Sequence, residues 1–335
     1  MLGDINHNIL SDFQEDLDYV YPENKANLHL PSTLESTSSG RFLNFSVALN
    51  APERNCDITL KLTPTPIIQQ DKIGSNILVI NIPFSNNYGH ALHDVLPKLL
   101  MLDSQKKYCK IITGTNPLLE QLIQTLQIKF SERIVFVKKE LNFNCDNITY
   151  RSDPAFHVRC IDSTRLFKAH IEEVIKNNIT TTKRNRLIYY KREGKDVRHS
   201  RSMDYQNEKE IVNLLKNYSD QNGLEFTLFN GLKNGKTMSH IEQIQLFREA
   251  KVVVGAHGSG LANTVWMDPA NDCRVCEFTS GTEIQVWGRI FDKNYNSLYG
   301  NMLSDYIDYN LIPFTKESTK DITHININNL KKFLT

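Results

Sequence analysis

The run 252–263 joins an apolar strand to a glycine-rich turn that contains one histidine. Its sequence is Val-Val-Val-Gly-Ala-His-Gly-Ser-Gly-Leu-Ala-Asn. A turn of small residues at a helix N-terminus binds anions, because backbone N–H groups point outward and the helix dipole adds positive charge. Turn geometry alone does not require a histidine. The run therefore predicts a site for the diphosphate of a nucleotide or nucleotide sugar, formed by His257, Gly258, Ser259 and Gly260.

The spacing of the three glycines separates this turn from better-known motifs. Gly255-x-x-Gly258-x-Gly260 is neither the dinucleotide fingerprint nor a P-loop, since no Lys-Ser or Lys-Thr pair follows. Leu261 stands where the G-x-S-x-G frame of a serine hydrolase has its last glycine. An alternative interpretation stays open, in which the turn needs its glycines only for backbone freedom.

A second group of polar residues follows the apolar strand expected at 77–80. His90 and Asp94 are four residues apart, so an α-helix places them on one face. A histidine and a carboxylate at the first turn of a helix are able to abstract a proton from a hydroxyl group. In the alternative interpretation, Asn86 or Asn87 caps the helix and Asp94 is an acid on its surface.

Two arginines bracket the strand expected at 187–190. Arg192 follows the carboxyl end of this strand, and Arg186 stands at its start. Guanidinium groups bind diphosphate oxygens in a bidentate manner, so Arg192 is predicted to reach the same ligand as the glycine turn. A solvated basic edge of the sheet is the alternative.

Strands and helices alternate along two stretches of the chain. Short apolar runs predict strands at 77–80, 110–113 and 134–137, and again at 187–190, 224–229, 252–254 and 274–278. Amphipathic segments predict helices at 90–102, 117–126, 162–179, 208–217 and 241–249. Such alternation is typical of parallel sheets covered by helices.

Two successive units of this kind predict an α/β fold with two Rossmann-like parallel-sheet domains that face each other across a cleft. The predicted parts are a domain over 1–165, a linker helix over 166–182, a domain over 183–312 and a tail helix over 313–335. Ligands of open parallel sheets bind beyond the carboxyl ends of the strands. The glycine turn and Arg192 both follow predicted strands, so we expect them to share one site.

The composition is that of a globular protein without a charge bias. Of 335 residues, 40% are hydrophobic and 23% charged, and 39 basic residues balance 38 acidic ones. This balance does not indicate a nucleic-acid partner, and no apolar run approaches the roughly 20 residues of a membrane span. No signal-peptide pattern begins at Met1, so we expect a cytoplasmic protein if Met1 is the native start.

Candidate metal ligands are few. Asp16-x-Asp18 has the residue types for a divalent cation, but it follows no hydrophobic strand and lies in an acidic run, which favours a solvated surface. Cys273-x-x-Cys276 has no second Cys/His pair at ligand spacing, which favours buried thiols over a zinc or redox site. We therefore expect no metal and no other cofactor.

Together these segments resemble glycosyltransferase family 61. The matching motifs are Asn87-Tyr88-x-His90-x-x-x-Asp94-x-x-Pro97, Arg186 to Arg192, Asn207-Glu208, Ile241-Glu242-Gln243-Ile244, the glycine turn through Asn263, and Trp266-Met267. They occur in the family's order. The resemblance implies a GT-B-like fold and an inverting transfer of a sugar from a UDP-sugar donor to a hydroxyl group of a glycan or protein acceptor.

An inverting transfer needs a base for the acceptor and positive charge on the departing diphosphate. We assign Asp94 as the base, with His90 orienting it or sharing the role. Arg192 is assigned to the diphosphate together with the turn, and Arg186 is a second cation for it. The first domain is then the acceptor side, and the second binds the nucleotide sugar.

Two further residues complete the predicted donor site. Asn263 lies within the matched motif, and Glu277 ends the strand that follows the turn. Glu277 would accept hydrogen bonds from ribose hydroxyls, or it is an exposed acid at a strand end. Because arginine and the helix terminus are able to do a metal's work, we expect metal independence. The transferred sugar is taken to be xylose or N-acetylglucosamine. The alternative function is a catalytically inactive module that binds a nucleotide sugar or a glycan.

Overall fold

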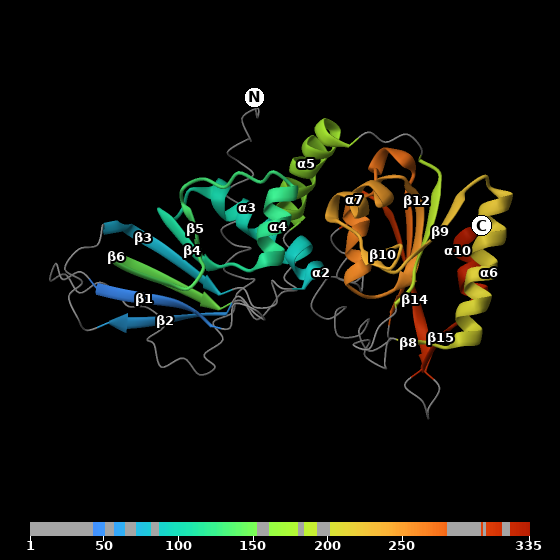
Figure 1. Ribbon diagram of the computed structural model, residues 1–335, viewed down its shortest axis with the longest axis horizontal. Coiled ribbons are helices and arrows are strands. Elements are labelled where there is room, and N and C mark those ends of the chain that lie inside the picture. The colour runs from blue at the N-terminus through green and yellow to red at the C-terminus, as the bar shows by residue number, and fades with distance from the viewer. Residues whose placement is uncertain are drawn as a thin grey trace. The chain divides into compact units, whose positions relative to one another are not determined.

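The computed structural model describes residues 43–50, 57–63, 72–81, 87–152, 161–179, 184–192, 202–279, 303, 306–316 and 322–335 (Figure 1). The chain divides into two compact units, Met1–Leu166 and Phe167–Thr335. Each unit has its own sheet, as the two alternating stretches predicted.

The first unit contains a six-stranded sheet in the order β2-β1-β6-β3-β4-β5. The strands are β1 (Leu43–Asn50), β2 (Asp57–Thr63), β3 (Lys72–Asn81), β4 (Lys110–Gly114), β5 (Ile134–Val137) and β6 (Glu140–Ser152). β3 is parallel to β4 and β6, and β4 is parallel to β5. β1 is antiparallel to β2 and β6, so the expectation of a wholly parallel sheet is wrong. The sequence did not predict β1, β2 or β6, because polar residues interrupt them.

The helices of the first unit begin directly at the predicted polar segment. They are α2 (Tyr88–His90), the π-helix η1 (Ala91–Val95), α3 (Leu96–Gln105) and α4 (Pro117–Thr125). Asn87 caps the first of them, because its side chain accepts from the backbone N–H groups of Gly89 and His90 at 2.9 and 3.4 Å. The sequence predicted one helix over 90–102, and the structure inserts a π-helical turn within it.

The second unit contains a seven-stranded sheet in the order β8-β15-β14-β13-β12-β7-β9. The strands are β7 (Arg186–Tyr190), β8 (Ser202–Met203), β9 (Glu225–Phe229), β12 (Ala250–Ala256), β13 (Arg274–Thr279), β14 (Asp308–Lys316) and β15 (Ile322–Ile325). The five strands from β9 to β14 are parallel, and β15 is antiparallel to β14. A small hairpin, β10 (Leu232–Lys233) and β11 (Lys236–Thr237), follows β9.

Helices cover both faces of the second sheet (Figure 1). α6 (Tyr205–Gln221) and α10 (Ile327–Leu334) lie on one face, and α7 (His240–Arg248) lies on the other. The 3₁₀-helices η3 (Ser259–Trp266) and η4 (Pro269–Asn271) connect β12 to β13. The tail helix predicted over 313–335 is wrong in extent, because the chain there first forms the end of β14 and then β15.

The linker helix predicted over 166–182 also differs from the structure. The helix is α5 (Ile161–Asn178), and its residues from Phe167 onward belong to the second unit. Lys168 is buried there and donates from Nζ to the backbone carbonyls of Val265 and Met267 at 2.5 and 3.0 Å. Most of this helix is therefore packed as part of the second unit.

Side chains alternate between the two faces of the second sheet, as the period of two requires. On β12, Val252, Val254 and Ala256 join the core under α6 and α10. The residues between them face α7, as do Tyr190 of β7 and Glu277 of β13. Thus Tyr190 and Glu277 lie on the face opposite the apolar core, whereas Arg274 of β13 lies on the α10 side, against the ring of Phe333.

Candidate functional site

The carboxyl ends of β7 and β12 bring two of the predicted diphosphate-binding residues into contact. β7 and β12 are adjacent and parallel, with Tyr190 paired to Gly255. Arg192 follows β7, and its Nη1 donates to the backbone carbonyl of His257, which follows β12. Both side chains are half-buried. The Arg192 guanidinium and the backbone of His257 therefore meet at the edge of the sheet where parallel α/β folds bind ligands.

The glycines of the turn allow this close approach. A Cβ at Gly255 would lie 2.7 Å from Cβ of Tyr190, and one at Gly260 would overlap the Tyr190 ring. A Cβ at Gly258 would lie 2.9 Å from Nη1 of Arg192. A side chain at any of the three positions would collide with Tyr190 or Arg192. Packing against these two residues therefore requires glycine there, whether or not an anion binds.

Asn263 holds the 3₁₀-helix that starts at Ser259. It is fully buried, and its Nδ2 donates to the carbonyl of Gly260 at 3.0 Å and to Oε1 of Gln243 at 3.1 Å. Its Oδ1 accepts from the Trp266 indole at 3.0 Å. Asn263 therefore stabilises the turn from within the protein core. The sequence predicted that it contacts the diphosphate directly, but its complete burial does not fit such a contact.

Glu277 is part of a buried hydrogen-bonded series. Its carboxylate is 0% exposed, Oε1 lies 2.5 Å from Nδ1 of His257, and Oε2 accepts from the hydroxyl of Tyr309 at 2.6 Å. This burial contradicts the alternative of an exposed acid at a strand end. In the structure the carboxylate contacts His257 and Tyr309, and a contact with ribose hydroxyls stays a prediction.

Arg186 lies at the opposite end of β7 from Arg192. Its Nε donates to Glu249 at 3.0 Å, and its Nη1 donates to Glu225 and Thr227 at 2.6 and 3.0 Å. These contacts are at the amino ends of β7, β9 and β12. Arg186 therefore joins strands, and its predicted role as a second diphosphate cation is not supported.

His90 and Asp94 lie in the first unit, on either side of the start of η1. Hydrogen bonds of a π-helix run from residue i to i+5, so the α-helical spacing that was expected to align the two side chains does not hold here. His90 is half-buried, whereas the side chain of Asp94 lies outside the described part of the structure. π-helical turns are frequent at functional sites.

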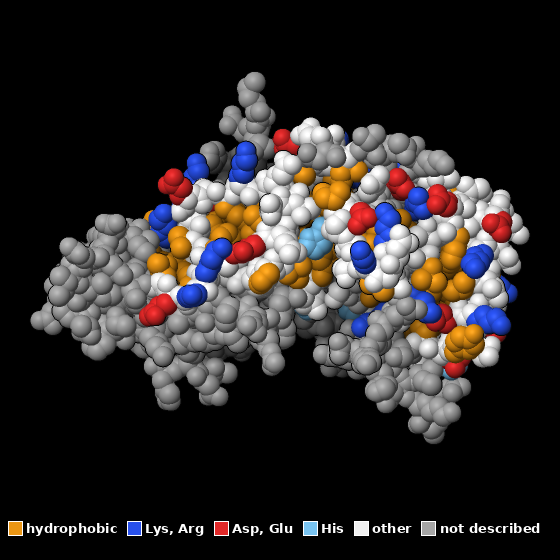
Figure 2. All heavy atoms as spheres, in the orientation of Figure 1, with side chains coloured by type: hydrophobic (Ala, Val, Ile, Leu, Met, Phe, Trp, Pro, Cys, Tyr) orange, Lys and Arg blue, Asp and Glu red, His pale blue; other side chains and the backbone are white. Residues whose placement is uncertain are grey.

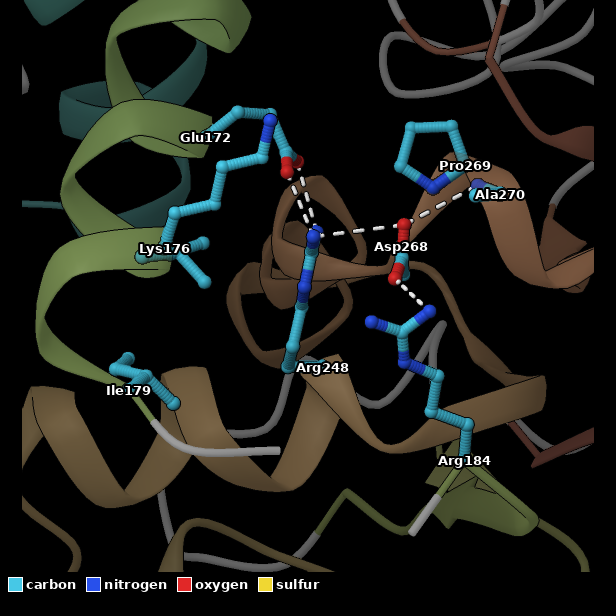
Figure 3. Close-up of a pocket in the computed structure, with 9 residues that line it drawn as sticks. Glu172, Lys176, Ile179, Arg184, Arg248, Asp268, Pro269 and Ala270 are labelled. Carbon is cyan, nitrogen blue, oxygen red and sulfur yellow. Dashed lines mark hydrogen bonds and ion pairs between the residues drawn. The ribbon is translucent and has the colours of Figure 1, made fainter. Parts of the chain in front are cut away.

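A pocket of about 560 Å³ lies among α5, the end of α7 and the η3–η4 segment (Figure 3). Its charged groups pair with one another. Arg248 is 4% exposed and makes two hydrogen bonds to Glu172, at 2.6 and 2.8 Å. Asp268 accepts ion pairs from Arg248 at 3.4 Å and from Arg184 at 2.7 Å. This cluster is at the amino ends of β7 and β12, away from Arg192 and His257.

Burial also changes the acidity of Lys168, Cys273 and Cys276 in the second unit. Desolvation lowers the pKa of Lys168, although the neighbouring Glu172 carboxylate opposes the shift. Desolvation raises the pKa of Cys273 to about 11 and raises that of Cys276 still more. Cys273 and Cys276 are both buried and form no disulfide, as the sequence favoured.

Among the described residues, no group of three or more His, Cys, Asp or Glu side chains is arranged to hold a metal ion. Asp16 and Asp18 lie outside that part of the chain. Within the same residues, no helix has the length and apolar character needed to cross a membrane. On the face shown in Figure 2, the described acidic and basic side chains are mixed.

Sequence reasoning missed three residues that shape the site. Tyr190 packs against the glycines, Gln243 holds Asn263, and Tyr309 donates to Glu277. Gln243 was within a matched motif, so its position carried a signal. Tyr309 lies on β14, which the sequence did not predict, and its contact depends on the register between β13 and β14.

The sheets define an α/β protein in which Arg192 and the glycine turn meet at one edge of the second sheet. Residues 88–276, more than half the chain, match the sequence profile of the family described as Glycosyltransferase 61. The chain belongs to this family, as its motifs predicted, and is a glycosyltransferase. No curated protein sequence matches it.

The solved structures that are similar to the chain include two of TibC. One is the dodecameric iron-containing heptosyltransferase TibC in complex with ADP-D-beta-D-heptose, with 8% identity, a TM-score of 0.41, and coverage of 88% of this chain and 89% of that one. The other is the bacterial iron-containing dodecameric glycosyltransferase TibC from enterotoxigenic E. coli H10407, with 9% identity, a TM-score of 0.39, and coverage of 84% and 81%. Family membership rests on the sequence match.

Proposed function

We propose that this glycosyltransferase inverts the anomeric centre as it transfers a sugar from a UDP-sugar to a hydroxyl group of a glycan or protein. The observation that carries the donor half of the proposal is the contact between Arg192 and His257 at the carboxyl ends of β7 and β12. Arg192, His257 and the backbone of residues 258–260 bind the diphosphate, and their positive charge stabilises it as it departs. No metal ion is required for this step.

The acceptor half of the proposal uses the first unit of a GT-B-like arrangement. Asp94 removes the proton from the acceptor hydroxyl as the oxygen attacks the anomeric carbon, and His90 orients Asp94 or shares its role. Support comes from the position of both residues within the part of the chain that matches the family, and from the π-helical turn that begins directly after His90 and contains Asp94. Xylose or N-acetylglucosamine is the proposed sugar.

A screen of UDP-sugars for hydrolysis and transfer, with and without EDTA, tests the proposal. We expect turnover of one UDP-sugar, an inverted product, and no loss of rate in EDTA. Asp94→Asn is expected to lower kcat by about 100-fold or more while leaving the affinity for uridine diphosphate unchanged, because general-base catalysis contributes ~10²–10⁴-fold.

The outcomes separate this proposal from its alternative. Binding of uridine diphosphate without turnover of any UDP-sugar would identify an inactive binding module. Near-normal kcat in Asp94→Asn would remove Asp94 from the mechanism, and loss of activity in EDTA would contradict metal independence.

A further inference from the structure

His257 is held by three kinds of contact at once. Its backbone N–H donates to the carbonyl of Phe278 at 2.8 Å, and its backbone carbonyl accepts from Arg192. Its ring nitrogen Nδ1 lies 2.5 Å from Oε1 of Glu277. The imidazole is therefore fixed in position and rotation, at the end of β12 that carries the glycine turn.

The pairing of β12, β13 and β14 sets the positions of the two residues that follow His257 in this series of contacts, Glu277 and Tyr309. Gly255 pairs with Glu277 across β12 and β13, and Glu277 pairs with Leu311 across β13 and β14. Tyr309, two residues before Leu311, faces the same side of the sheet because side chains alternate with a period of two. Three adjacent parallel strands thus align Tyr309, Glu277 and His257 in one series.

The carboxylate at the centre of this series fixes the donor and acceptor roles. An ionised carboxylate only accepts hydrogen bonds, and a fully buried one needs such donors to offset its lost hydration. The Tyr309 hydroxyl supplies one donor to Glu277, and Nδ1 of His257 is the atom placed to supply the other as an N–H group. With Nδ1 already protonated, a second proton on the imidazole binds at Nε2.

We propose that Glu277 and Tyr309 are positioning residues, which keep Nδ1 of His257 protonated so that Nε2 carries a second proton to a phosphate oxygen of the donor. This inference rests on the proposed function, because the diphosphate is the ligand of Nε2. The second proton comes from solvent when the diphosphate binds, and no covalent bond forms or breaks.

Nitrogen-15 NMR of histidine-labelled protein at neutral pH, with and without uridine diphosphate, tests the inference. The chain has 10 histidines, and loss of a signal in His257→Gln assigns the one of interest. In wild-type protein we expect Nδ1 to be protonated throughout and both ring nitrogens to be protonated in the complex. In Glu277→Gln the amide donates to Nδ1 instead, so only Nε2 is protonated, with or without the ligand.

Affinities for uridine diphosphate provide a second readout. Glu277→Gln is expected to bind about tenfold more weakly, since a charged hydrogen bond is lost, whereas Tyr309→Phe keeps both ring protons and binds about threefold more weakly. Glu249→Gln is the matched control, because this buried glutamate bonds to Arg186 at the other end of the sheet, 3.0 Å from Nε. The control is expected to leave the His257 signals and the affinity unchanged.

Several results would overturn the inference. One is a single ring proton on His257 in the wild-type complex, another is the same proton pattern in wild type and Glu277→Gln, and a third is unchanged affinity in Glu277→Gln. If wild-type protein binds no uridine diphosphate, the proposed function fails together with the role of Nε2. Loss of the Nδ1 proton in free Glu277→Gln would still support the positioning of His257 by Glu277.

Discussion

The ring of Tyr190 fills the space into which a side chain at Gly260 would project. A Cβ at Gly260 would overlap three atoms of that ring, and a Cβ at Gly255 would lie 2.8 Å from the Tyr190 carbonyl oxygen. The backbone of the glycine turn therefore packs directly against Tyr190 at the end of β7. This relationship fixes where the turn ends and, with it, where the backbone of residues 258–260 lies.

Gly260→Ala is expected to destabilise the second unit. The added methyl group collides with an aromatic ring held between strands, and overpacking of this kind costs ~1–3 kcal/mol. Urea unfolding measures the loss. The variant is also expected to bind uridine diphosphate more weakly, because the turn must shift to admit the methyl group.

A double-mutant cycle with Tyr190→Ala provides the control for this prediction. Once the ring is removed, Gly260→Ala meets open space, so the free energies of the two single changes are not additive. We expect the double variant to be more stable than the sum of the two losses predicts. Additive losses would show that Tyr190 is not the cause of the glycine requirement.

Arg192→Ala is expected to lower kcat/KM for the donor by about 10- to 100-fold, because a charged hydrogen bond to the diphosphate is worth ~1.5–3 kcal/mol. Steady-state kinetics with the best UDP-sugar measures this effect. Arg186→Ala serves as the comparison, because Arg186 pairs with Glu225 and Glu249 at the far end of the strand. Equal losses of kcat/KM in the two variants would contradict the assignment of Arg192 alone to the donor.

Apolar periodicity predicted the parts of the fold that are buried on both faces. Strands β3, β4, β7 and β12 are runs of apolar residues, and their burial in a parallel sheet explains why the sequence shows them clearly. β6, with the sequence ELNFNCDNITYRS, carries polar residues along its length. Its identity as a strand depends on pairing with β1 and β3, which local sequence does not encode.

Residue types singled out two residues that the structure brings into contact, but they did not reveal the burial of a third. Arg192 and His257 are polar residues that follow apolar strands, and the structure brings them together. Glu277 has the same sequence signature, yet it is 0% exposed. What distinguishes it is Tyr309, 32 residues further along the chain, whose hydroxyl makes burial of the carboxylate possible. Such long-range partners are not visible in local patterns.

Arg248→Met is expected to destabilise the second unit by about 3 kcal/mol, since removing one partner of a buried ion pair costs ~3–5 kcal/mol and Glu172 is partly exposed. The substitution leaves the carboxylates of Glu172 and Asp268 without the guanidinium between them (Figure 3). Chemical denaturation measures the change. Lys176→Met, which alters an exposed lysine of the same pocket, is expected to change stability by less than ~0.5 kcal/mol. Similar losses in both variants would show that the ion pairs contribute little.

The buried thiols of Cys273 and Cys276 are expected to be unreactive in the native protein. Only the thiolate reacts, and burial raises the pKa of Cys273 from 9.0 to about 11, so little thiolate forms at neutral pH. Cys109 is more exposed and is expected to be modified first by a maleimide reagent. Peptide mass mapping after a short exposure measures the order, and early modification of Cys273 would contradict its burial.

The same pKa shift makes stability depend on alkaline pH. Between pH 9 and about 11 the unfolded chain releases the Cys273 proton while the folded protein keeps it, so the folded state binds more protons and stability falls as pH rises. The loss reaches up to ~3 kcal/mol above the folded pKa, and none of it is present below the unfolded one. Cys273→Ala removes this contribution. Urea unfolding at about pH 8 and about pH 10.5 should therefore show a smaller fall in the variant than in wild type, and equal falls would contradict the assignment.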